Sequence, residues 1–405
     1  MSSSIAWLDT SADEQRRVRE MIALFSQHES RDELGIGQIR DVFSDSLFPG
    51  TSVIQTRARY FLIVPWVFTA SGRRGRSGPN LVAHATNTER RLVELLKDAG
   101  ATDGLIGRRA GAAVKILPSA IYWSGLRTYG ILTHDVATDR LSSIGSRQRE
   151  DTDELAARIV GDWDPTLPGI PDGFPQAVPG GLDLNAAEAS WLRDRILTAV
   201  PATLLAHLLT SPVAPDPDSP APWQDTVASS APKDVRELLR HAEMFSLAMN
   251  GAALLYNLQV GERYEAAGHT RIVDPAQSYL DAYDGWVAAL EAARSQLQTW
   301  DRTEFWKLVL QRNPRIAPRT QLFVTAWTNA VRDGTAHTGV TDQSLRALVA
   351  DRERAIKKSQ SRMVNDKLLG AWSGESGSGR LVYRWPQVRR IVTDIHDGMT
   401  ADARP

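Results

Sequence analysis

Hydrophobic residues in this chain recur mostly at intervals of three and four, the spacing of one helix face. Between residues 38 and 47 such a stripe contains Ile39, Val42, Phe43 and Leu47. A longer stripe between residues 235 and 256 predicts one long helix. We therefore expect a mainly α fold, with a helical N-terminal module and a helical bundle in the middle. The longer stripe consists of Val235, Leu238, Leu239, Ala242, Phe245, Met249, Ala252 and Tyr256.

The most regular pattern spans residues 279–300, where apolar residues alternate spacings of four and three. This is the a/d pattern of a helix packed against another helix, over about three heptads. We favour a seam within the chain's own bundle, and a contact between copies of the chain is the alternative. The seam consists of Tyr279, Tyr283, Trp286, Leu290, Ala293, Leu297 and Trp300.

Capping signals and prolines place other helices. Ser52 and Gln55 fit a capping box, which predicts a helix running toward Pro65. Pro118 is typical of a first helical position and predicts another helix. Further helices are expected from Ser11 or Asp13 to about Ser26, and from Thr86 to Asp98.

The C-terminal segment is expected to be small and α/β. A basic helix ends near Trp372, and the Gly/Ser-rich residues 374–379 form a loop. Residues 380–385 have the composition of a strand, and Pro386 begins a last amphipathic helix.

Two proline-rich stretches, residues 162–182 and 211–223, indicate linkers or surface loops, because proline lacks the amide donor and fixes φ. We predict four parts along the chain. They are a basic helical module at 1–160, a proline-rich linker region with short helices at 161–230, an acidic helical bundle at 231–350, and a basic helix–loop–strand–helix segment at 351–405.

The charge distribution agrees with this division. Residues 1–150 carry 20 basic and 16 acidic side chains, residues 151–350 carry 16 and 25, and residues 351–405 carry 11 and 7. The net charges are therefore +4, −9 and +4, within a total of −1. Basic ends around an acidic middle are typical of a chain whose ends contact phosphates or an acidic partner.

The chain lacks the residues that several classes of enzyme require. The 405-residue chain has no cysteine, which excludes disulfides, thiolate metal sites and a cysteine nucleophile. No Gly-Lys pair, His-Glu-x-x-His motif or Gly-x-Ser-x-Gly motif occurs. Residues 34–37 begin like a dinucleotide loop, but Arg40 stands where the third glycine belongs. An enzyme is therefore the less favoured hypothesis, and no cofactor is expected.

One group of carboxylates could still support metal chemistry. Asp32, Glu33 and Asp41 cluster around Gly35, and Asp45 lies one helical turn after Asp41. Such carboxylates, held together, could bind Mg²⁺ for phosphodiester cleavage. The alternative is that they cap helices or pair with nearby arginines.

Candidate contacts for a nucleic acid or a protein partner are mostly arginines. Gln55 and Arg59 would share one helix face and could hold phosphate oxygens or carboxylates. Their alternative role is a buried ion pair with Asp41 or Asp45. The complete set of candidates is Gln55, Arg57, Arg59, Arg73, Arg74, Arg76, Arg127, Arg380 and Arg384.

Arg127 belongs to a helix with the interleaved basic and aromatic residues of some nucleic-acid-binding helices. Tyr122 and Trp123 precede it, and packing in the core is the alternative for these two rings. A basic turn leads into this helix and contains Arg108, Arg109 and Lys115.

The longest apolar run, Tyr60–Phe68, has nine residues, against the roughly 20 that span a bilayer. We expect it in the core, and an interfacial anchor beside the arginines at 73–76 is the alternative. Residues 2–9 are polar and do not form a signal peptide. A cytoplasmic protein with no membrane partner is expected.

Several strings occur together along the chain and resemble a known bacterial family, domain of unknown function 6361. The resemblance implies a bacterial setting in mobile elements or antiphage defence, beside helicases and phosphodiesterases. It implies no activity, cofactor or catalytic residue. The strings are Trp7-Leu-Asp9, residues 31–37, Ile39-Arg-Asp41, residues 48–52, residues 55–62, Pro65-Trp66, Pro118-Ser119, Tyr122-Trp123, Tyr383-Arg-Trp385 and Asp394-Ile395.

Our main hypothesis is an accessory protein of a bacterial antiphage-defence or DNA-processing system. It would bind nucleic acid or a defence-system protein such as a helicase or a phosphodiesterase. One alternative is a Mg²⁺-dependent enzyme that cleaves phosphodiesters with the acidic cluster near Gly35. The other is a purely structural subunit that assembles through the seam at residues 279–300.

Overall fold

The computed structural model describes residues 32–72, 78–133 and 163–401. These residues form a mainly α protein, with no strand and with an isolated β-bridge between Leu132 and Trp163. The segment 380–385, predicted as a strand, is irregular. Tyr383 and Arg384 have φ angles of 53° and 67°, which an extended strand does not allow. The helix predicted to end near Ser26 lies outside the described residues.

Two compact units make up the chain, and each joins segments that are distant in sequence. Unit 1 contains residues 1–42 and 241–381, and unit 2 contains residues 43–240 and 382–405. The four parts predicted from the sequence are continuous stretches, whereas each unit combines pieces of several of them. Ion pairs join these segments, Glu33 with Arg362 in unit 1 and Arg57 with Asp394 in unit 2.

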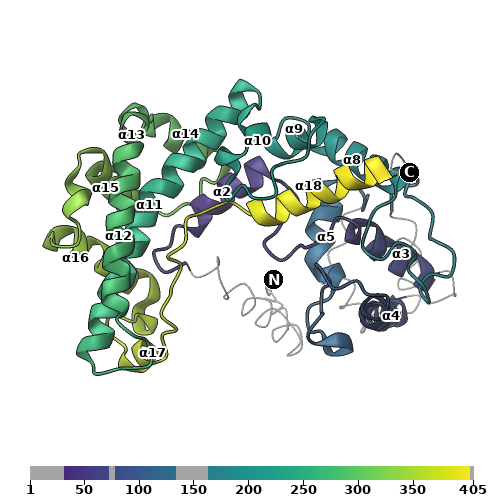
Figure 1. The fold of residues 1–405 in the computed structure, drawn as a ribbon, viewed down its shortest axis with the longest axis horizontal. Coiled ribbons are helices and arrows are strands. Elements are labelled where there is room, and N and C mark those ends of the chain that lie inside the picture. Colours follow the sequence, from purple (N-terminus) through teal and green to yellow (C-terminus); the bar gives the residue numbers. More distant parts are fainter. Residues whose placement is uncertain (1–31, 73–77, 134–162, 402–405) are drawn as a thin grey trace, which may run out of the picture. The chain divides into compact units, whose positions relative to one another are not determined.

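Unit 1 is a helical bundle around α11 (Lys233–Ala266), which contains the long stripe predicted at 235–256. α12 (Pro275–Ala292) lies beside it (Figure 1), and the indole of Trp286 donates to the Leu247 carbonyl of α11 at 2.8 Å. The first turns of α2 (Gly37–Leu47) also belong to this unit. Its other helices are α13 (Arg294–Thr299), α14 (Arg302–Arg312), α15 (Pro318–Arg332), η3 (Thr335–Thr338), α16 (Gln343–Lys357), η4 (Lys358–Gln360) and α17 (Asp366–Gly370).

The seam at residues 279–300 packs inside this bundle, as we favoured. The rings of Trp286 and Trp327 stack with centroids 6.2 Å apart, and the Tyr283 hydroxyl donates to the Ala336 carbonyl at 2.6 Å. The helix is interrupted at Ala293, between α12 and α13. The chain itself therefore covers the large side chains of the seam. The buried members are Tyr283, Trp286, Leu290, Leu297 and Trp300.

In unit 2, α3 (Tyr60–Gly72) is buried along its whole apolar run, Tyr60–Phe68. The helix continues through Pro65, because burial of apolar side chains on every side offsets the missing amide donor. α4 (Gly78–Asp98) and α5 (Pro118–Thr128) pack against α3. No helix in the described ranges is long and apolar enough to cross a membrane.

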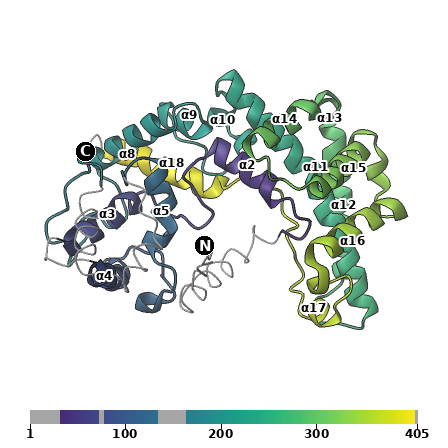
Figure 2. The ribbon, with the colours of Figure 1, turned by 180° about the vertical axis from the view of Figure 1, so that it is seen from behind.

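The rest of unit 2 is organised around α18 (Trp385–Thr400), which lies along α8 (Ala186–Ala199) in Figures 1 and 2. α18 buries Val388, Ile391, Val392 and Ile395, the apolar face predicted after Pro386. The other elements are η1 (Gly111–Ala113), α9 (Leu204–Thr210), η2 (Pro222–Gln224) and α10 (Thr226–Ser229).

Candidate functional site

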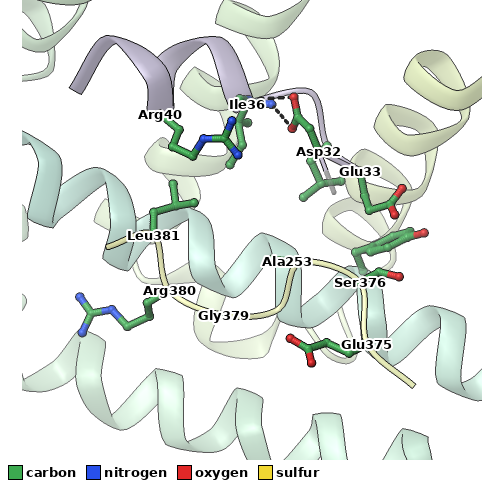
Figure 3. Close-up of a pocket in the computed structure, with 14 residues that line it drawn as sticks. Asp32, Glu33, Ile36, Arg40, Ala253, Glu375, Ser376, Gly379, Arg380 and Leu381 are labelled. Atoms are coloured by element: carbon green, nitrogen blue, oxygen red, sulfur yellow. Dashed lines mark hydrogen bonds between the residues drawn. The ribbon is translucent and has the colours of Figure 1, made fainter. Parts of the chain in front are cut away.

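A cavity of about 210 Å³ lies inside unit 1 (Figure 3). It is enclosed by residues 32–40 at the start of α2, by Ala253 and Tyr256 of α11, and by the loop 375–381. The glycine turn near Gly35 and the Gly/Ser-rich loop are separate features of the sequence. In the folded chain they are two walls of one cavity.

Asp32 and Arg40 form the polar part of the α2 wall. The two carboxylate oxygens of Asp32 accept the backbone N–H groups of Ile36 (2.7 Å) and Gly37 (2.8 Å), so Asp32 caps the helix. The guanidinium of Arg40 points toward Asp32 (Figure 3). A Cβ on Gly37 would lie 2.7 Å from Oδ2 of Asp32, so the close approach of this carboxylate requires glycine.

Arg352 of α16 holds the glycine turn through its backbone carbonyls. Its guanidinium donates to the carbonyls of Leu34 (2.8 Å) and Gly35 (3.1 Å) and to the Thr320 hydroxyl (2.8 Å). Gly35 has a φ of +64°, and a Cβ there would lie 2.7 Å from this guanidinium. The backbone carbonyls of the turn are thus fixed by a buried cation.

Glu33 is the most buried carboxylate of the cavity wall and pairs with two cations. Its oxygens lie 3.1 Å from Nζ of Lys357 and 2.9 Å from Nη1 of Arg362. Burial by itself would raise the pKa of Glu33, but the charges of Lys357 and Arg362 outweigh burial and hold the pKa below its usual value. The Tyr256 hydroxyl lies 3.4 Å from Arg362 and from buried Glu353, which extends this network beneath the cavity.

Asparagines of α11 hold the opposite wall, the loop 375–381. The side chain of Asn257 accepts the N–H of Ser376 (2.9 Å) and donates to the Ser376 carbonyl (3.0 Å). Asn250 donates to the Ser378 carbonyl at 2.8 Å. This wall is therefore held in place before any ligand arrives.

The three carboxylates suggested for Mg²⁺ have separate partners. Asp32 caps α2, Glu33 lies between two cations, and Asp41 accepts from Arg40 at 2.9 Å. Across the described ranges, no group of three or more histidine or acidic side chains is arranged to hold a metal ion. Helix capping and ion pairing account for the positions of these residues.

The segment from Gln55 to Arg59, in unit 2, was predicted to be helical, but it is irregular. Oε1 of Gln55 accepts the N–H of Ser52 (3.2 Å), but the helix begins only at Tyr60. Gln55 and Arg59 therefore do not share a helix face. Together with Arg57 they are buried, with exposed fractions of 2%, 3% and 7% for Gln55, Arg59 and Arg57.

Arg57 is part of a buried ionic cluster. Its Nε donates to both oxygens of Asp394 on α18 (3.0 and 2.9 Å), and its Nη2 donates to Asp183 (2.5 Å). Burial lowers the pKa of Arg57, but the hydrogen bonds and charges of these carboxylates outweigh burial and raise it. The buried ion pair given above as the alternative for Gln55 and Arg59 forms at Arg59, with Glu188 as its partner in place of Asp41 or Asp45.

Arg59 joins the same region of unit 2 to α8. It donates to both oxygens of Glu188 (2.9 and 2.8 Å) and to the carbonyls of Pro179 (2.6 Å) and Gly181 (2.9 Å). Glu188 also completes a capping box with Asn185 at the start of α8. Removing one partner of a buried ion pair costs about 3–5 kcal/mol, so Arg57 and Arg59 hold the fold rather than await a ligand.

The other predicted contacts differ in exposure. Arg127 and Arg380 are exposed, and Arg380 lies at the edge of the cavity. Arg384 is half-buried and pairs with Asp45 at 2.7 Å. Three predicted contacts lie outside the described residues, namely Arg73, Arg74 and Arg76.

A family model described as a family of unknown function (DUF6361) matches residues 1–399. The chain belongs to this family. No curated protein and no solved structure matches the chain. The resemblance seen in the sequence strings is thus confirmed, and the match includes all of unit 1 and unit 2 up to residue 399.

This DUF6361 chain also has a basic surface in unit 2, which we define by Arg91, Lys97, Arg108, Arg109 and Lys115. All five are exposed, the first two on α4 and the others on the segment between α4 and α5.

η1 attaches that segment to α4, because the N–H of Ala112 donates to Glu94 at 2.8 Å. Glu94 lies three residues from both Arg91 and Lys97, so the two sets of cations adjoin. The basic turn was among the features predicted from the sequence, but Arg91 and Lys97 were not. The spacing of three residues between each of them and Glu94 is the sequence pattern that could have identified them.

Proposed function

We propose that the protein binds the phosphate backbone of nucleic acid through the basic surface of unit 2, as an accessory component of a bacterial antiphage-defence or DNA-processing system. The observation that supports this role is the exposure of five cations on adjoining elements. Of the nearby carboxylates, Glu94 holds η1, Asp103 pairs with Arg390 of α18, and Asp98 is exposed beside Lys97. The surface therefore has an excess of positive charge.

Such a surface suits phosphates better than bases. Exposed arginine and lysine side chains contact phosphate oxygens without reading sequence. Arg73, Arg74 and Arg76 precede α4 in the sequence and remain predicted contacts. The total charge of −1 supplies no general attraction to nucleic acid, so binding would depend on this local surface.

Fluorescence anisotropy with short single-stranded and duplex DNA and RNA tests the proposal. If about five phosphates are neutralised on duplex DNA, the logarithm of affinity falls with the logarithm of salt at a slope near −4.5. Affinity should then fall by about 10²–10³-fold between 50 and 200 mM salt. Absence of binding at low salt would reject the proposal and favour a protein partner such as a helicase or a phosphodiesterase.

A charge-reversal pair locates the contact. The variant Arg108→Glu, Arg109→Glu, Lys115→Glu should abolish binding at 50 mM salt and keep the melting temperature. The matched control, Arg312→Glu, Arg315→Glu, Arg319→Glu, reverses three exposed arginines of unit 1 and should bind like the parent. Equal losses in both variants would show that the basic surface is not the contact. Repeating the titration with Mg²⁺ tests the cleavage alternative, for which we expect intact oligonucleotides.

A further inference from the structure

We propose that the helices α14 and α15 of unit 1 form a docking surface for an acidic amphipathic helix of a protein partner. This inference does not rest on the proposed function, because it concerns other residues in the other unit. It is carried by an exposed leucine, by half-buried apolar side chains beside it and by arginines that no carboxylate of the described residues neutralises. The residues of this α14–α15 surface are Trp306, Leu310, Arg312, Arg315, Arg319 and Leu322.

Leu322 is the most exposed large apolar side chain on the helices of the described ranges. Its exposed fraction is 70%, and that of Ile356 on α16, the next in order, is 39%. The buried face of α15 contains Phe323, Val324 and Trp327, and Leu322 is not part of it. A single exposed leucine is common on proteins, so its neighbours decide whether it marks an interface.

α14 and α15 pack as an antiparallel pair. Nη1 of Arg302 donates to Oδ1 of Asn329 at 2.6 Å. One turn further along α14, the indole of Trp306 donates to Oγ1 of Thr325 at 3.2 Å, one turn back along α15. These two contacts set a register in which each later turn of α14 meets an earlier turn of α15.

This register gives Leu322 apolar neighbours. One turn beyond Trp306, Leu310 falls opposite Gln321, the residue before Leu322. Trp306 and Leu310 are both half-buried. Trp306, Leu310 and Leu322 therefore form an apolar strip across the two helices that is partly open to solvent.

Three exposed arginines adjoin this strip. Arg319 lies three residues before Leu322, on the same face of α15, and Arg312 and Arg315 follow Leu310 in the sequence. None of the three arginines forms an ion pair within the described ranges. Their charges are therefore available to a partner.

The carboxylates nearby are engaged with other groups. Residues 305–331 contain no acidic residue, and the acids of the adjoining glycine turn, Asp32 and Glu33, have the partners described above. The three arginines therefore leave the α14–α15 surface with a net positive charge. Among residues 294–357, Asp301 and Asp342 cap helices, Glu304 pairs with Lys307, Asp333 with Arg332 and Asp351 with Arg354, and Glu353 accepts from Ser361.

An acidic amphipathic helix matches both properties of the surface. Its apolar face would cover Leu322 and the strip, as amphipathic helices do in the grooves of their partners. Its carboxylates would pair with the arginines, whose guanidinium groups bind carboxylates through two parallel hydrogen bonds. Phosphates of a nucleic acid could also pair with the arginines, but a phosphate backbone has no apolar face and would leave Leu322 in water.

Fluorescence anisotropy of labelled synthetic peptides with the full chain tests the inference. The probe is a peptide of about 18 residues, long enough to form a helix, with leucine at every third or fourth position and glutamate on the opposite face. It should bind at low salt and more weakly as salt is added. Two matched peptides, one with lysine for glutamate and one with the leucines scattered around the helix, should bind more weakly by about tenfold or more. No binding of the probe at millimolar concentration, or equal binding of all three peptides, would overturn the proposal.

Leu322→Ser is the informative variant, because the side chain is exposed and its loss leaves the buried face of α15 intact. We expect about tenfold weaker affinity for the acidic peptide, from the lost burial of one leucine. The matched control is Val273→Ser, since Val273 is 79% exposed and lies before α12 of the same unit. This control should leave the affinity unchanged, and equal affinities in the two variants would refute the role of Leu322.

Charge reversal separates this inference from the proposed function. Reversing the three arginines of the α14–α15 surface to glutamate should abolish binding of the acidic peptide and keep the melting temperature. The charge-reversal variant of unit 2 should bind the peptide like the parent. Retained peptide binding in the unit 1 variant would overturn the proposal. Displacement of the peptide from the unit 2 variant by short duplex DNA at physiological salt would also overturn it, because the surface would then be a phosphate contact.

Discussion

Arg57 and Arg59 illustrate how burial decides the role of a charged residue. A buried guanidinium requires carboxylates or carbonyls around it, and these come from residues far along the chain, namely Asp183, Glu188 and Asp394. Two arginines in a short polar string are equally compatible with a surface that binds phosphate. Their exposed fractions of 7% and 3% place them in the structural role.

Glu89 is a second buried charge, and it titrates near neutrality. It accepts the N–H (2.7 Å) and the hydroxyl (2.8 Å) of Ser119 at the start of α5. Burial raises the pKa of Glu89 from 4.5 to about 7, against the opposing effect of these hydrogen bonds. The folded state therefore holds the proton more tightly than the unfolded state. The resulting stabilisation is complete below pH 4.5 and is lost as the pH rises through about 7.

Replacing Glu89 by Gln should remove this contribution to the pH dependence. A pKa shift from 4.5 to about 7 corresponds to ~3 kcal/mol between pH 4 and pH 8. Urea unfolding at several pH values should show that the free energy of unfolding of the parent falls as the pH rises from 4 to 8. In Glu89→Gln this fall should be smaller by about 3 kcal/mol. Glu237→Gln, at an exposed position of α11, should follow the parent curve. Parallel curves for the parent and Glu89→Gln would contradict the prediction.

At the scale of elements, the approach of α12 to α11 depends on glycines of α11, and Gly251 allows the closest contact. A Cβ on Gly251 of α11 would lie 2.1 Å from Cζ2 of Trp286, so the indole occupies the space that any other residue would fill. The a/d pattern predicted that Trp286 faces another helix. It did not predict which helix, or that a missing side chain makes room for the ring.

Gly251→Ala should therefore destabilise unit 1 by about 1–3 kcal/mol, the usual effect of overpacking a core. Gly285→Ala is the matched control, since Gly285 lies within α12 and a Cβ there meets no atom within 4 Å. This control should stabilise the chain by about 0.5–1 kcal/mol, because alanine favours the helix. Denaturant midpoints measure both effects, and stabilisation by Gly251→Ala would be inconsistent with the close contact.

At the scale of the whole molecule, segments distant in sequence complete each unit. Unit 2 needs α8 and α18 to neutralise Arg57 and Arg59, although α18 follows all of unit 1 in the sequence. Unit 1 needs residues 32–42 to close its cavity and to pair Glu33. Folding of either unit therefore depends on pairing between residues more than 100 positions apart.

The predicted N-terminal module, residues 1–160, should not fold alone. It contains Arg57 and Arg59 but lacks Glu188 and Asp394, which would leave two guanidinium groups without their carboxylates. A chain ending at residue 381 should likewise lose unit 2, because α18 is missing. Circular dichroism melting should show no cooperative transition for the 1–160 fragment. A cooperative transition there would support the continuous division of the chain instead.

The sequence alone determined what depends on local spacing. The stripes at 38–47, 235–256 and 279–300 predicted helices that the structure contains, because an apolar face must be buried whatever its partner. The irregular segments were less predictable. Residues 55–59 and 380–385 were predicted as a helix and a strand, but tertiary contacts of Arg57, Tyr383 and Arg384 override their local preferences.

Only the tertiary structure decided which polar groups meet. Asp32, Glu33 and Asp41 are neighbours in sequence but bind different partners, whereas the turn near Gly35 and the loop 375–381 enclose one cavity from positions over 300 residues apart. The physical reason is that helix periodicity is encoded over a few residues. Ion pairs and cavities, in contrast, depend on how the helices pack and on which of their ends come together.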